Sequence, residues 1–367
     1  IDATLQGLHQ VAVPGQVSSG FERPPTVPAD APEFVRNVTA TLIEGRGNSL
    51  PVSLMPADGT WPTGTTRFEK RNIALELPKW EDDLCTHCGK CVFVCPHSAI
   101  RSKAFAEAEL AGAPPNFKSI QIKGKDFPQG VHIAYQVAPE DCTGCTLCVD
   151  ICPIRDKSNA SRKALNMAAQ PPLREAEVAN WEFFQNLPEY DHADIKLSTM
   201  KGSMLLEPHF EFSGACVGCG ETPYLKLATQ LFGGRMMVAN ATGCSSIYGG
   251  NLPTTPWTTR KDGLGPTWSN SLFEDNAEFG FGFRLAIDKT TEYARELLVK
   301  NMACGCAACK GTEGLKQAIL DADQSNEEGL AKQRDRVTEL KRILETVQAP
   351  EARRLETLTD YLVKMSI

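Results

Sequence analysis

The residues best suited to chemistry in this 367-residue sequence are its 14 cysteines, and most of them lie in tight groups. Two runs share gaps of two, two and three residues and end in Cys-Pro. Cysteines this close cannot bridge each other within a run, so the spacing favours metal ligation and a reducing, cytoplasmic compartment or an anaerobic organelle. The runs are Cys85, Cys88, Cys91 and Cys95, before Pro96, and Cys142, Cys145, Cys148 and Cys152, before Pro153.

This spacing is the ligand pattern of bacterial ferredoxins with two [4Fe–4S] clusters, in which the last cysteine of each run ligates the other cluster. The predicted sets are therefore Cys85, Cys88, Cys91 and Cys152, and Cys142, Cys145, Cys148 and Cys95. A pair of zinc knuckles is the alternative, but zinc ligands usually come as two separated pairs. We expect His87 and His97 to be solvated or to support the ligands rather than bind metal.

A third group comprises Cys216, Cys219, Glu221 and Cys244. The first three precede a predicted helix, whose N-terminus favours thiolate and carboxylate, and Cys244 follows a predicted strand. Since ligands bind at the carboxyl ends of strands in open α/β sheets, we expect the three cysteines to meet near one crevice. The pattern leaves open a metal cluster or a buried reduced pair with a separate core cysteine.

Two further sets of residues, a fourth cysteine group and a group of basic residues, each have a structural and a functional interpretation. A fourth cysteine group is interpreted as reduced surface or interface thiols, with metal binding as the less favoured alternative. Basic residues around the two Cys-Pro ends form either a docking patch for an acidic electron carrier or an ordinary solvated surface. The cysteines are Cys304, Cys306 and Cys309, and the basic residues are Arg101, Lys103, Arg155, Lys157, Arg162 and Lys163.

The elements that would position these residues change along the chain. Residues 1–63 are rich in Pro and Gly and are predicted to be a linker lying over another domain. Residues 64–183 hold a repeat offset by 57 positions, in which an alternating strand leads into each cysteine run. The strand residues are Ile73, Leu75 and Leu77 in the first copy, and Ile133, Tyr135 and Val137 in the second.

From residue 184 the pattern predicts helices and strands, so we expect an α+β region followed by an α/β region with a helical insertion. A Thr-Pro start and a terminating Gly predict a helix over 222–232, and a strand follows over 236–241. Beyond Glu274 the sequence is mostly helical. A seven-residue spacing of Leu330, Val337 and Leu344, joined by Leu340 and Val347, predicts a helical hairpin with the segment after Pro350.

Composition excludes two classes of partner. The chain has 38 Lys and Arg against 45 Asp and Glu, a net charge of −7, which disfavours a general nucleic-acid binder. Its longest uncharged stretch, 236–259, is rich in Gly, Ser, Thr, Asn and Pro, so no membrane span is expected. Because the sequence starts at Ile1 and stops just after an amphipathic run, we expect it to be a piece of a longer protein.

Beyond the cysteine runs, three segments closely resemble pyruvate:ferredoxin (flavodoxin) oxidoreductases: residues 56–65 (PADGTWPTGT), 211–223 (EFSGACVGCGETP) and 240–255 (NATGCSSIYGGNLPTT). The resemblance covers nearly the whole chain. It implies oxidative decarboxylation of pyruvate with coenzyme A to acetyl-CoA, with electrons passing through three [4Fe–4S] clusters to ferredoxin or flavodoxin. It also implies a homodimer and the remaining segments of the same enzyme as partners.

The resemblance further implies roles for the third group. Cys216, Cys219 and Cys244 would ligate a third cluster, and Glu221 and Cys244 would contact thiamine diphosphate. In the family the fourth ligand of that cluster, the motif for Mg²⁺ and diphosphate, and the pyruvate contacts lie in other segments. This chain would therefore be the end of one domain with a linker domain (1–63), a two-cluster ferredoxin-like domain (64–183) and the first part of a thiamine diphosphate-binding domain (184–367). Cys304, Cys306 and Cys309 match no motif of the family.

Overall fold

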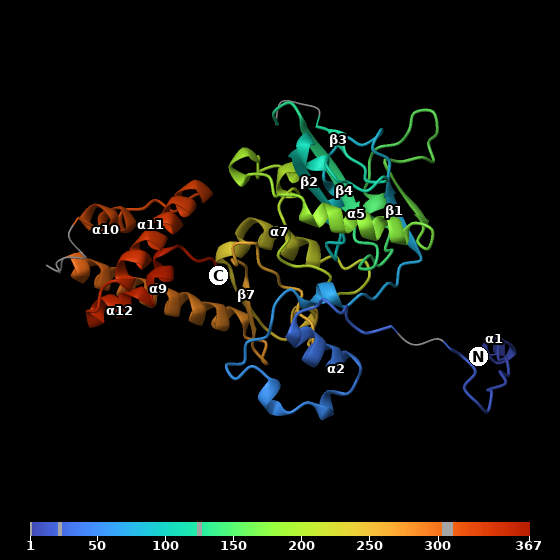
Figure 1. Ribbon diagram of the computed structural model, residues 1–367, viewed down its shortest axis with the longest axis horizontal. Coiled ribbons are helices and arrows are strands. Elements are labelled where there is room, and N and C mark those ends of the chain that lie inside the picture. The colour runs from blue at the N-terminus through green and yellow to red at the C-terminus, as the bar shows by residue number, and fades with distance from the viewer. Residues whose placement is uncertain (1, 21–23, 123–126, 303–310) are drawn as a thin grey trace.

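The computed structural model describes residues 2–20, 24–122, 127–302 and 311–367. A region rich in strands, carrying the two cysteine runs, lies on one side of the molecule and a lobe of helices lies on the other (Figure 1). A small parallel strand pair and helix α7 lie between them. Cys304, Cys306 and Cys309 fall outside the described residues, so the prediction made for them is not addressed by the structure.

The cysteine-run region exchanges strands between the two copies of the repeat. The strand before the first run pairs with the strand after the second, and the strand before the second run pairs with the strand after the first, all antiparallel. This exchange brings the end of each run beside the start of the other. The elements are β1 (Glu76–Trp80), α3 (Lys90–Val94), β2 (Ile100–Ala106), β3 (Ile120–Gln121), β4 (Val131–Val137), α4 (Leu147–Asp150) and β5 (Leu165–Ala169), and β3 extends the β2–β4 pair along the free edge of β4.

The first strand differs from its prediction, whereas the second agrees. Ile73 and Leu75 are 54% and 85% exposed and precede β1, while Leu77 is fully buried. The backbone turns at Asn72, with φ of 51°, and antiparallel pairing with β5 begins only at Glu76. Alternating apolar residues in 73–77 therefore gave the wrong strand start. In the second copy, all three predicted strand residues are buried in β4.

The core of this region continues past residue 183. Helix α5 (Arg174–Asn186) contacts β4, and its Trp181 and Phe184 pack with Phe105 in one cluster. Residues 195–206, which include the short helix α6 (Met200–Ser203), contribute Ile195, Met204 and two leucines to the core around Trp80 and β4. The segment that leads to the third cysteine group is thus anchored on the repeat.

The central region agrees closely with the predicted helix and strand. Helix α7 spans Thr222–Phe232, as predicted, and β6 (Met237–Asn240) occupies the predicted strand less one residue at each end. Helix α8 (Cys244–Gly249) follows directly, and β7 (Thr267–Asn270) pairs with β6 in parallel. Ser366 near the chain's end bridges to Met236 beside β6, so the C-terminus returns to this region (Figure 1).

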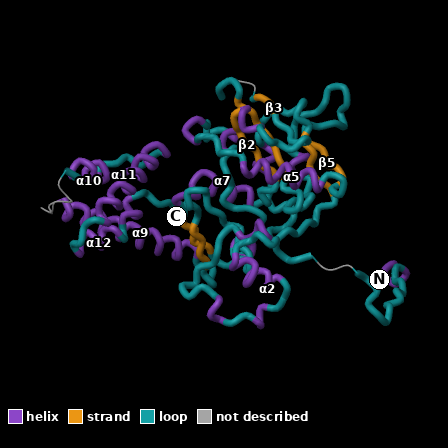
Figure 2. The backbone as a smooth tube through the Cα atoms, viewed as in Figure 1, coloured by secondary structure: helices purple, strands orange, loops and turns teal. Residues whose placement is uncertain are grey.

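The helical lobe contains the predicted hairpin. Its heptad residues Leu330, Val337 and Leu344 are all buried, and Val337 and Leu344 share a core cluster with Ala352 and Leu355 of the helix that starts at Pro350. Figure 2 shows the lobe as almost wholly helical. None of the described helices is both long and apolar enough to cross a membrane. The helices are α9 (Asn276–Met302), α10 (Glu313–Leu320), α11 (Glu327–Glu345) and α12 (Pro350–Glu356).

The end of the N-terminal segment lies along another part of the chain, and the linker assignment for residues 1–63 stays a prediction. Helix α1 (Asp2–Gln6) is exposed, and a π-helical turn (Val35–Thr39) continues into α2 (Ala40–Ile43) around a small core. Residues 61–66 then run along 253–257, where Trp61 Nε1 donates to Pro253 O at 3.0 Å and Thr66 N to Thr255 O at 3.3 Å. Two of the segments that carry the resemblance therefore contact each other.

Candidate metal centres

The exchanged strands create two small cavities walled by cysteines. The first is lined by Cys85, Cys88 and Cys91 of the first run and by Cys152, the last cysteine of the second. The second cavity is lined by Cys142, Cys145 and Cys148 together with Cys95. Each cavity therefore gathers three cysteines of one run and the last of the other, which is the arrangement that the spacing predicts.

The walls of the two cavities follow the same internal symmetry. Strand β1 contributes Trp80 to the first cavity and Pro78 to the second, while β4 contributes Tyr135 to the first and Val137 to the second. Positions 80 and 137, like 78 and 135, differ by the repeat offset of 57. Apolar and aromatic walls exclude water, which is one of the ways a protein controls the potential of an iron–sulfur cluster.

The backbone wraps the thiols in the same way in both copies. The amide of His87 points at Cys85 Sγ at 3.4 Å, and the amide of Gly144 points at Cys142 Sγ at the same distance. Both residues have positive φ, 56° and 68°, and so do the next equivalent pair, Gly89 at 74° and Thr146 at 67°. His87 and Thr146 adopt a conformation that costs a non-glycine residue about 1–2 kcal/mol, so the wrap is imposed by its surroundings.

The thiol environments fit a metal group and disfavour free thiolates. Burial raises the pKa of Cys85, Cys91 and Cys148, and raises that of Cys142 to about 12. Neighbouring thiolates of the same set raise these values further, so a bound cation is needed to hold four thiolates together. Within the described residues, no three His, Cys, Asp or Glu side chains are placed to hold a single metal ion. Sulfurs spread around a cavity suit a larger group, such as an iron–sulfur cube, better than zinc.

The two histidines of the first run are buried, so of the two alternatives predicted for them the solvated one is wrong, and both lie beside the cysteines. His97 lines the second cavity, and its Nδ1 lies 3.2 Å from Ser213 O. Burial lowers the pKa of His97 to about 4, so the ring is neutral and Nδ1–H donates to that carbonyl. His87 is 4% exposed and stacks against Tyr135.

The third group is assembled around a buried tyrosine. Tyr248, on α8, is 4% exposed, and the Glu221 carboxylate and the thiols of Cys219 and Cys244 act electrostatically on its phenol. Burial, that carboxylate and the two thiols raise the pKa of Tyr248, which keeps the phenol protonated. Cys216 and Cys244 are exposed, unlike the cysteines of the two runs. The arrangement favours an open site over a buried thiol pair.

The third group lies against the second cavity. Gly218, between Cys216 and Cys219, has φ of 75°, and a Cβ at this position would lie 3.9 Å from Leu147 of α4. The ring of His97, which lines the second cavity, also lies near the backbone of Cys216. Thr222 Oγ1, at the start of α7, donates to Pro96 O at 2.7 Å. The second cavity is thus the one in contact with the third group.

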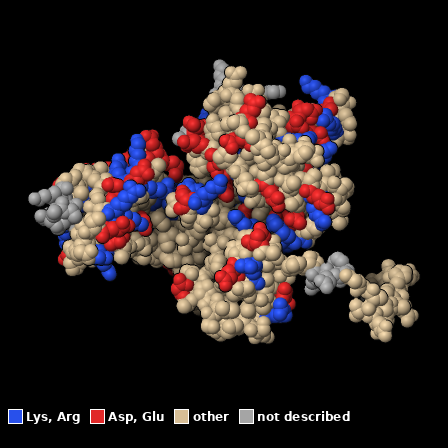
Figure 3. All heavy atoms as spheres, viewed as in Figure 1, with Lys and Arg blue, Asp and Glu red and all other residues tan. Residues whose placement is uncertain are grey.

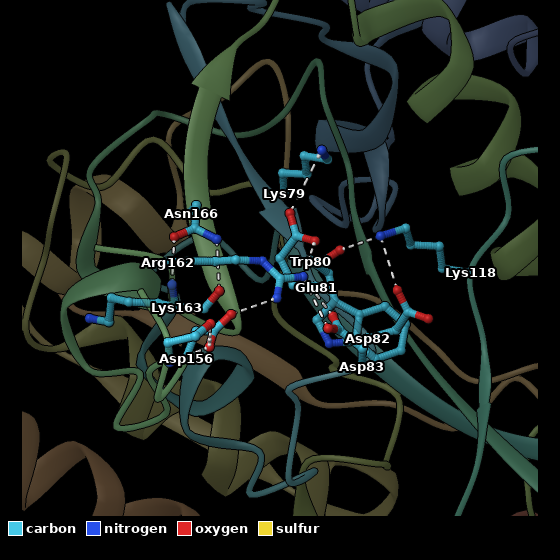
Figure 4. A network of polar contacts seen from close by, with 11 residues as sticks. Lys79, Trp80, Glu81, Asp82, Asp83, Lys118, Asp156, Arg162, Lys163 and Asn166 are labelled. Carbon is cyan, nitrogen blue, oxygen red and sulfur yellow. Dashed lines mark hydrogen bonds and ion pairs between the residues drawn. The ribbon is translucent and has the colours of Figure 1, made fainter. Parts of the chain in front are cut away.

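The basic residues around the Cys-Pro ends do not form one docking patch. Arg162 lies between Glu81, Asp83 and Asp156, with N–O distances of 2.9–3.2 Å, in the network drawn in Figure 4. Acidic and basic side chains are also mixed over the face shown in Figure 3. Five of the six cations have partners within the chain: Arg101 pairs with Glu211, Lys103 with Glu189 and Arg162 with its three carboxylates, while Arg155 and Lys163 donate to the carbonyls of Ala160 and Val149.

Two family models match parts of the chain. Residues 84–155 match a 4Fe-4S dicluster domain, and residues 20–74 match a domain of unknown function named EKR. The first match covers both cysteine runs and both cavities. By this match, the region of the two cysteine runs is a 4Fe-4S domain, which supports iron–sulfur clusters as the groups that these cysteines bind.

Similarity to named proteins covers the whole chain. It is 53% identical over 368 residues to a putative pyruvate-flavodoxin oxidoreductase of Synechocystis sp., matching 100% of this chain and 30% of that protein. A probable pyruvate-flavodoxin oxidoreductase of Escherichia coli is 56% identical over 73% of this chain and 23% of its own length. The pyruvate:ferredoxin oxidoreductase of Moorella thermoacetica is 43% identical over 90% of this chain and 28% of its own length.

The chain therefore corresponds to one segment of the pyruvate-flavodoxin and pyruvate:ferredoxin oxidoreductase family, and the resemblance in its motifs is confirmed. It spans about 30% of the length of the first relatives.

Proposed function

We propose that this chain is the electron-transfer part of an enzyme that oxidises pyruvate with coenzyme A to acetyl-CoA and passes the electrons to ferredoxin or flavodoxin. The observation that carries this proposal is the pair of cavities, each lined by four cysteines in the exchanged arrangement. The similarity to pyruvate-flavodoxin oxidoreductases over the whole chain supports the substrate and the acceptor. Another 2-oxoacid:ferredoxin oxidoreductase is the variant that shares all of these features.

Each residue set has an assigned role in this proposal. Cys85, Cys88, Cys91 and Cys152 hold one [4Fe–4S] cluster, and Cys95, Cys142, Cys145 and Cys148 hold the second. When bound, a cluster of this kind stores and releases one electron at a potential that the protein sets. The chain's own contribution is to bury the sulfurs, direct backbone amides at them and keep water out.

In this proposal the third group links the two clusters to the site where pyruvate is oxidised. Cys216, Cys219 and Cys244 hold a third [4Fe–4S] cluster with a ligand from another segment, and Glu221 and Cys244 contact thiamine diphosphate with its Mg²⁺. The thiols and the carboxylate fit such groups because they gather at the starts of α7 and α8, around the protonated Tyr248. Thiamine diphosphate supplies the carbanion chemistry of decarboxylation when bound. The exposure of Cys216 and Cys244 agrees with a site that further segments cover.

The domain layout and partners follow from this assignment. Residues 1–63 are the end of one domain with a linker, 64–183 the two-cluster domain, and 184–367 the start of the thiamine diphosphate domain. The whole enzyme works as a homodimer, in a reducing cytoplasm or anaerobic organelle, without nucleic-acid or membrane partners. The acidic net charge of −7 supports the exclusion of nucleic acid.

A second candidate is a separate iron–sulfur subunit that transfers electrons without catalysis of its own. It is favoured by the fact that all eight cysteines of the two cavities lie in this one chain. It assigns no role to Glu221, to the buried Tyr248 or to the glycine-containing loop before Cys244. Turnover of pyruvate by the intact protein, lost on Glu221→Gln with all iron retained, would separate the two candidates in favour of the enzyme.

Metal analysis of anaerobically purified protein tests the proposal directly. Two clusters correspond to about eight irons per chain, and a completed third group raises this to about twelve. The protein should be brown and should show [4Fe–4S] EPR signals after reduction. Background iron with stoichiometric zinc would overturn the assignment.

A further inference from the structure

A buried lysine outside the cysteine runs holds the end of the first run. Lys226 lies on α7 and is 1% exposed. Its ammonium donates to the carbonyls of Val92, Phe93 (3.0 Å) and Cys95 (3.1 Å). These carbonyls end the short helix α3, where backbone acceptors have no partner within the helix and the dipole is negative. Lys226 therefore ties α7 to the corner of the chain that carries Cys95.

The second run has an equivalent lysine from a different place in the sequence. Lys163 Nζ donates to the carbonyls of Val149 and Asp150 (3.4 Å), at the end of α4. Residues 149 and 150 stand 57 positions after 92 and 93, so both lysines cap the same helix end in the two copies. Lys163 follows its own run, whereas Lys226 comes from the region of the third cysteine group.

The two caps differ in solvation. Lys163 is only partly buried and lies beside the Arg162 network of carboxylates (Figure 4), so water and counter-charges screen it. Lys226 is shielded from water, and the anionic groups acting on it are the thiolates of Cys95 and Cys91. A charge acts more strongly in a low-dielectric interior than at a surface. The same helix end thus carries a strong positive field in the first copy and a weak one in the second.

Resting on the cluster assignment proposed above, we propose that Lys226 is a positioning residue for electron transfer, which fixes Cys95 against α7 and raises the reduction potential of the clusters that Cys95 and Cys91 ligate. Reduction adds one negative charge to a cluster, so a buried cation stabilises the reduced state. The lysine comes from α7, which begins one residue after Glu221. Helix α7, which begins beside Glu221 of the third group, therefore also supplies the charge that favours reduction of the neighbouring clusters.

Potentiometric EPR titration of the intact, anaerobically prepared protein tests this proposal. Lys226→Met removes the charge and keeps much of the volume. We expect at least a tenfold change in the one-electron reduction equilibrium of the Cys95 cluster, a downward shift of about 59 mV in its midpoint potential. Lys226→Arg keeps the charge and should keep the potential close to that of the unmodified protein. If the Lys226→Met variant takes up less iron, Lys226→Gln removes the same charge with a polar side chain, and its midpoint potential is measured instead.

Two other lysines serve as matched controls. Lys163→Met should shift a midpoint by less than Lys226→Met, because water already screens Lys163. Lys316 is also 1% exposed but lies on α10 in the helical lobe, so Lys316→Met should lower thermal stability without moving any midpoint. Lower stability with unchanged midpoints in the Lys226 variants would overturn the proposal and leave only a packing role. Absence of iron–sulfur signals in the unmodified protein would instead overturn the cluster assignment.

Discussion

The two cysteine regions of this chain differ in how completely the chain encloses them. The two runs, Cys85 to Cys95 and Cys142 to Cys152, together form the double run, and all eight of their cysteines are buried or half-buried, four in the wall of each cavity. In the third group Cys216 and Cys244 are exposed, and three cysteines are present. The chain thus encloses the cysteines of the double run by itself, whereas those of the third group lie on a surface that another segment can cover.

The difference shows that an internal repeat can enclose a metal site by itself, whereas a site outside the repeat stays open. Strand exchange between two similar halves closes both cavities with residues from one stretch of about a hundred positions. The third group is built at the starts of two helices, α7 and α8, which strand β6 separates in the sequence, and no second copy of these elements supplies its remaining wall. Substitutions in the two regions can test this difference in enclosure.

The largest effect should come from breaking the exchange of the last cysteines. Because Cys152 lies with Cys85, Cys88 and Cys91, Cys152→Ser should abolish the same EPR signal as Cys88→Ser, with loss of about four irons. Cys95→Ser should match Cys145→Ser in the same way. The measurement is iron content together with low-temperature EPR of the reduced protein.

The control for this experiment is to compare the Cys152 variant with a variant of its own run, Cys145→Ser. If Cys152→Ser removed the signal that Cys145→Ser removes, each run would hold its own cluster and the exchanged arrangement would be wrong. Cys216→Ser should spare both signals of the double run.

The sequence predicted the double run well because spacing alone constrains it. Gaps of two, two and three residues and the 57-residue offset imply the exchange, and the cavities follow it residue for residue. The helix over 222–232 and the hairpin built on Leu330, Val337 and Leu344 were also predictable, since capping residues and seven-residue spacing are local signals.

What the sequence did not predict depends on contacts between distant segments. The start of β1 is set by pairing with β5, 89 positions later, and apolar alternation at Ile73 and Leu75 misplaced it. Lys226 was missed because it stands outside the repeat, and a lone lysine in a helix gives no sign of burial. Lys163 was assigned to a surface patch because its hydrogen bonds to carbonyls leave no trace in charge patterning.

The next prediction concerns the third group alone. Cys244→Ser should remove one EPR signal of the intact protein and leave the two signals of the double run, because Cys244 belongs to the third group and lines neither cavity. Iron content should fall by about four per chain. Survival of all three signals would show that this group is not a cluster site.

A buried ion triad ties the two regions together, and its removal should weaken the whole assembly. Glu211 is 3% exposed and pairs with Arg67 of the N-terminal segment and Arg101 of β2. Burial raises the pKa of Glu211, but the two arginines lower it by more, so it stays below its ordinary value. Its stabilising effect is therefore complete at neutral pH, declines as the pH falls below the ordinary carboxyl pKa, and is lost once the pH has fallen through the lowered pKa of Glu211.

Glu211→Gln leaves two arginines without their carboxylate, one of them, Arg101, largely buried. Removing one partner of a buried pair costs about 3–5 kcal/mol, and partial exposure of Arg67 places the expected cost near the lower figure. The midpoint of thermal unfolding should fall by several degrees. Glu69→Gln, which breaks a half-exposed pair with Arg71, is the matched control and should cost about 1 kcal/mol or less. Equal effects of the two variants would contradict a buried triad.

The smallest effect compares one glycine from each region with nearly the same backbone. Gly89 in the first run has φ of 74° and Gly218 in the third group has φ of 75°. A Cβ at Gly89 would lie 3.2 Å from Met200 O and 3.4 Å from Met204 Cβ, whereas at Gly218 its nearest neighbour would be 3.9 Å away. Both alanine variants carry the conformational cost of about 1–2 kcal/mol, but Gly89→Ala must also push against the backbone of α6.

Gly89→Ala should therefore lower the unfolding midpoint more than Gly218→Ala. The extra cost measures how tightly the enclosed region is packed, independently of any metal ligand. Equal losses would mean that α6 yields freely and that the first run is no better enclosed than the open third group. A Gly218→Ala loss exceeding that of Gly89→Ala would reverse the contrast between the two regions.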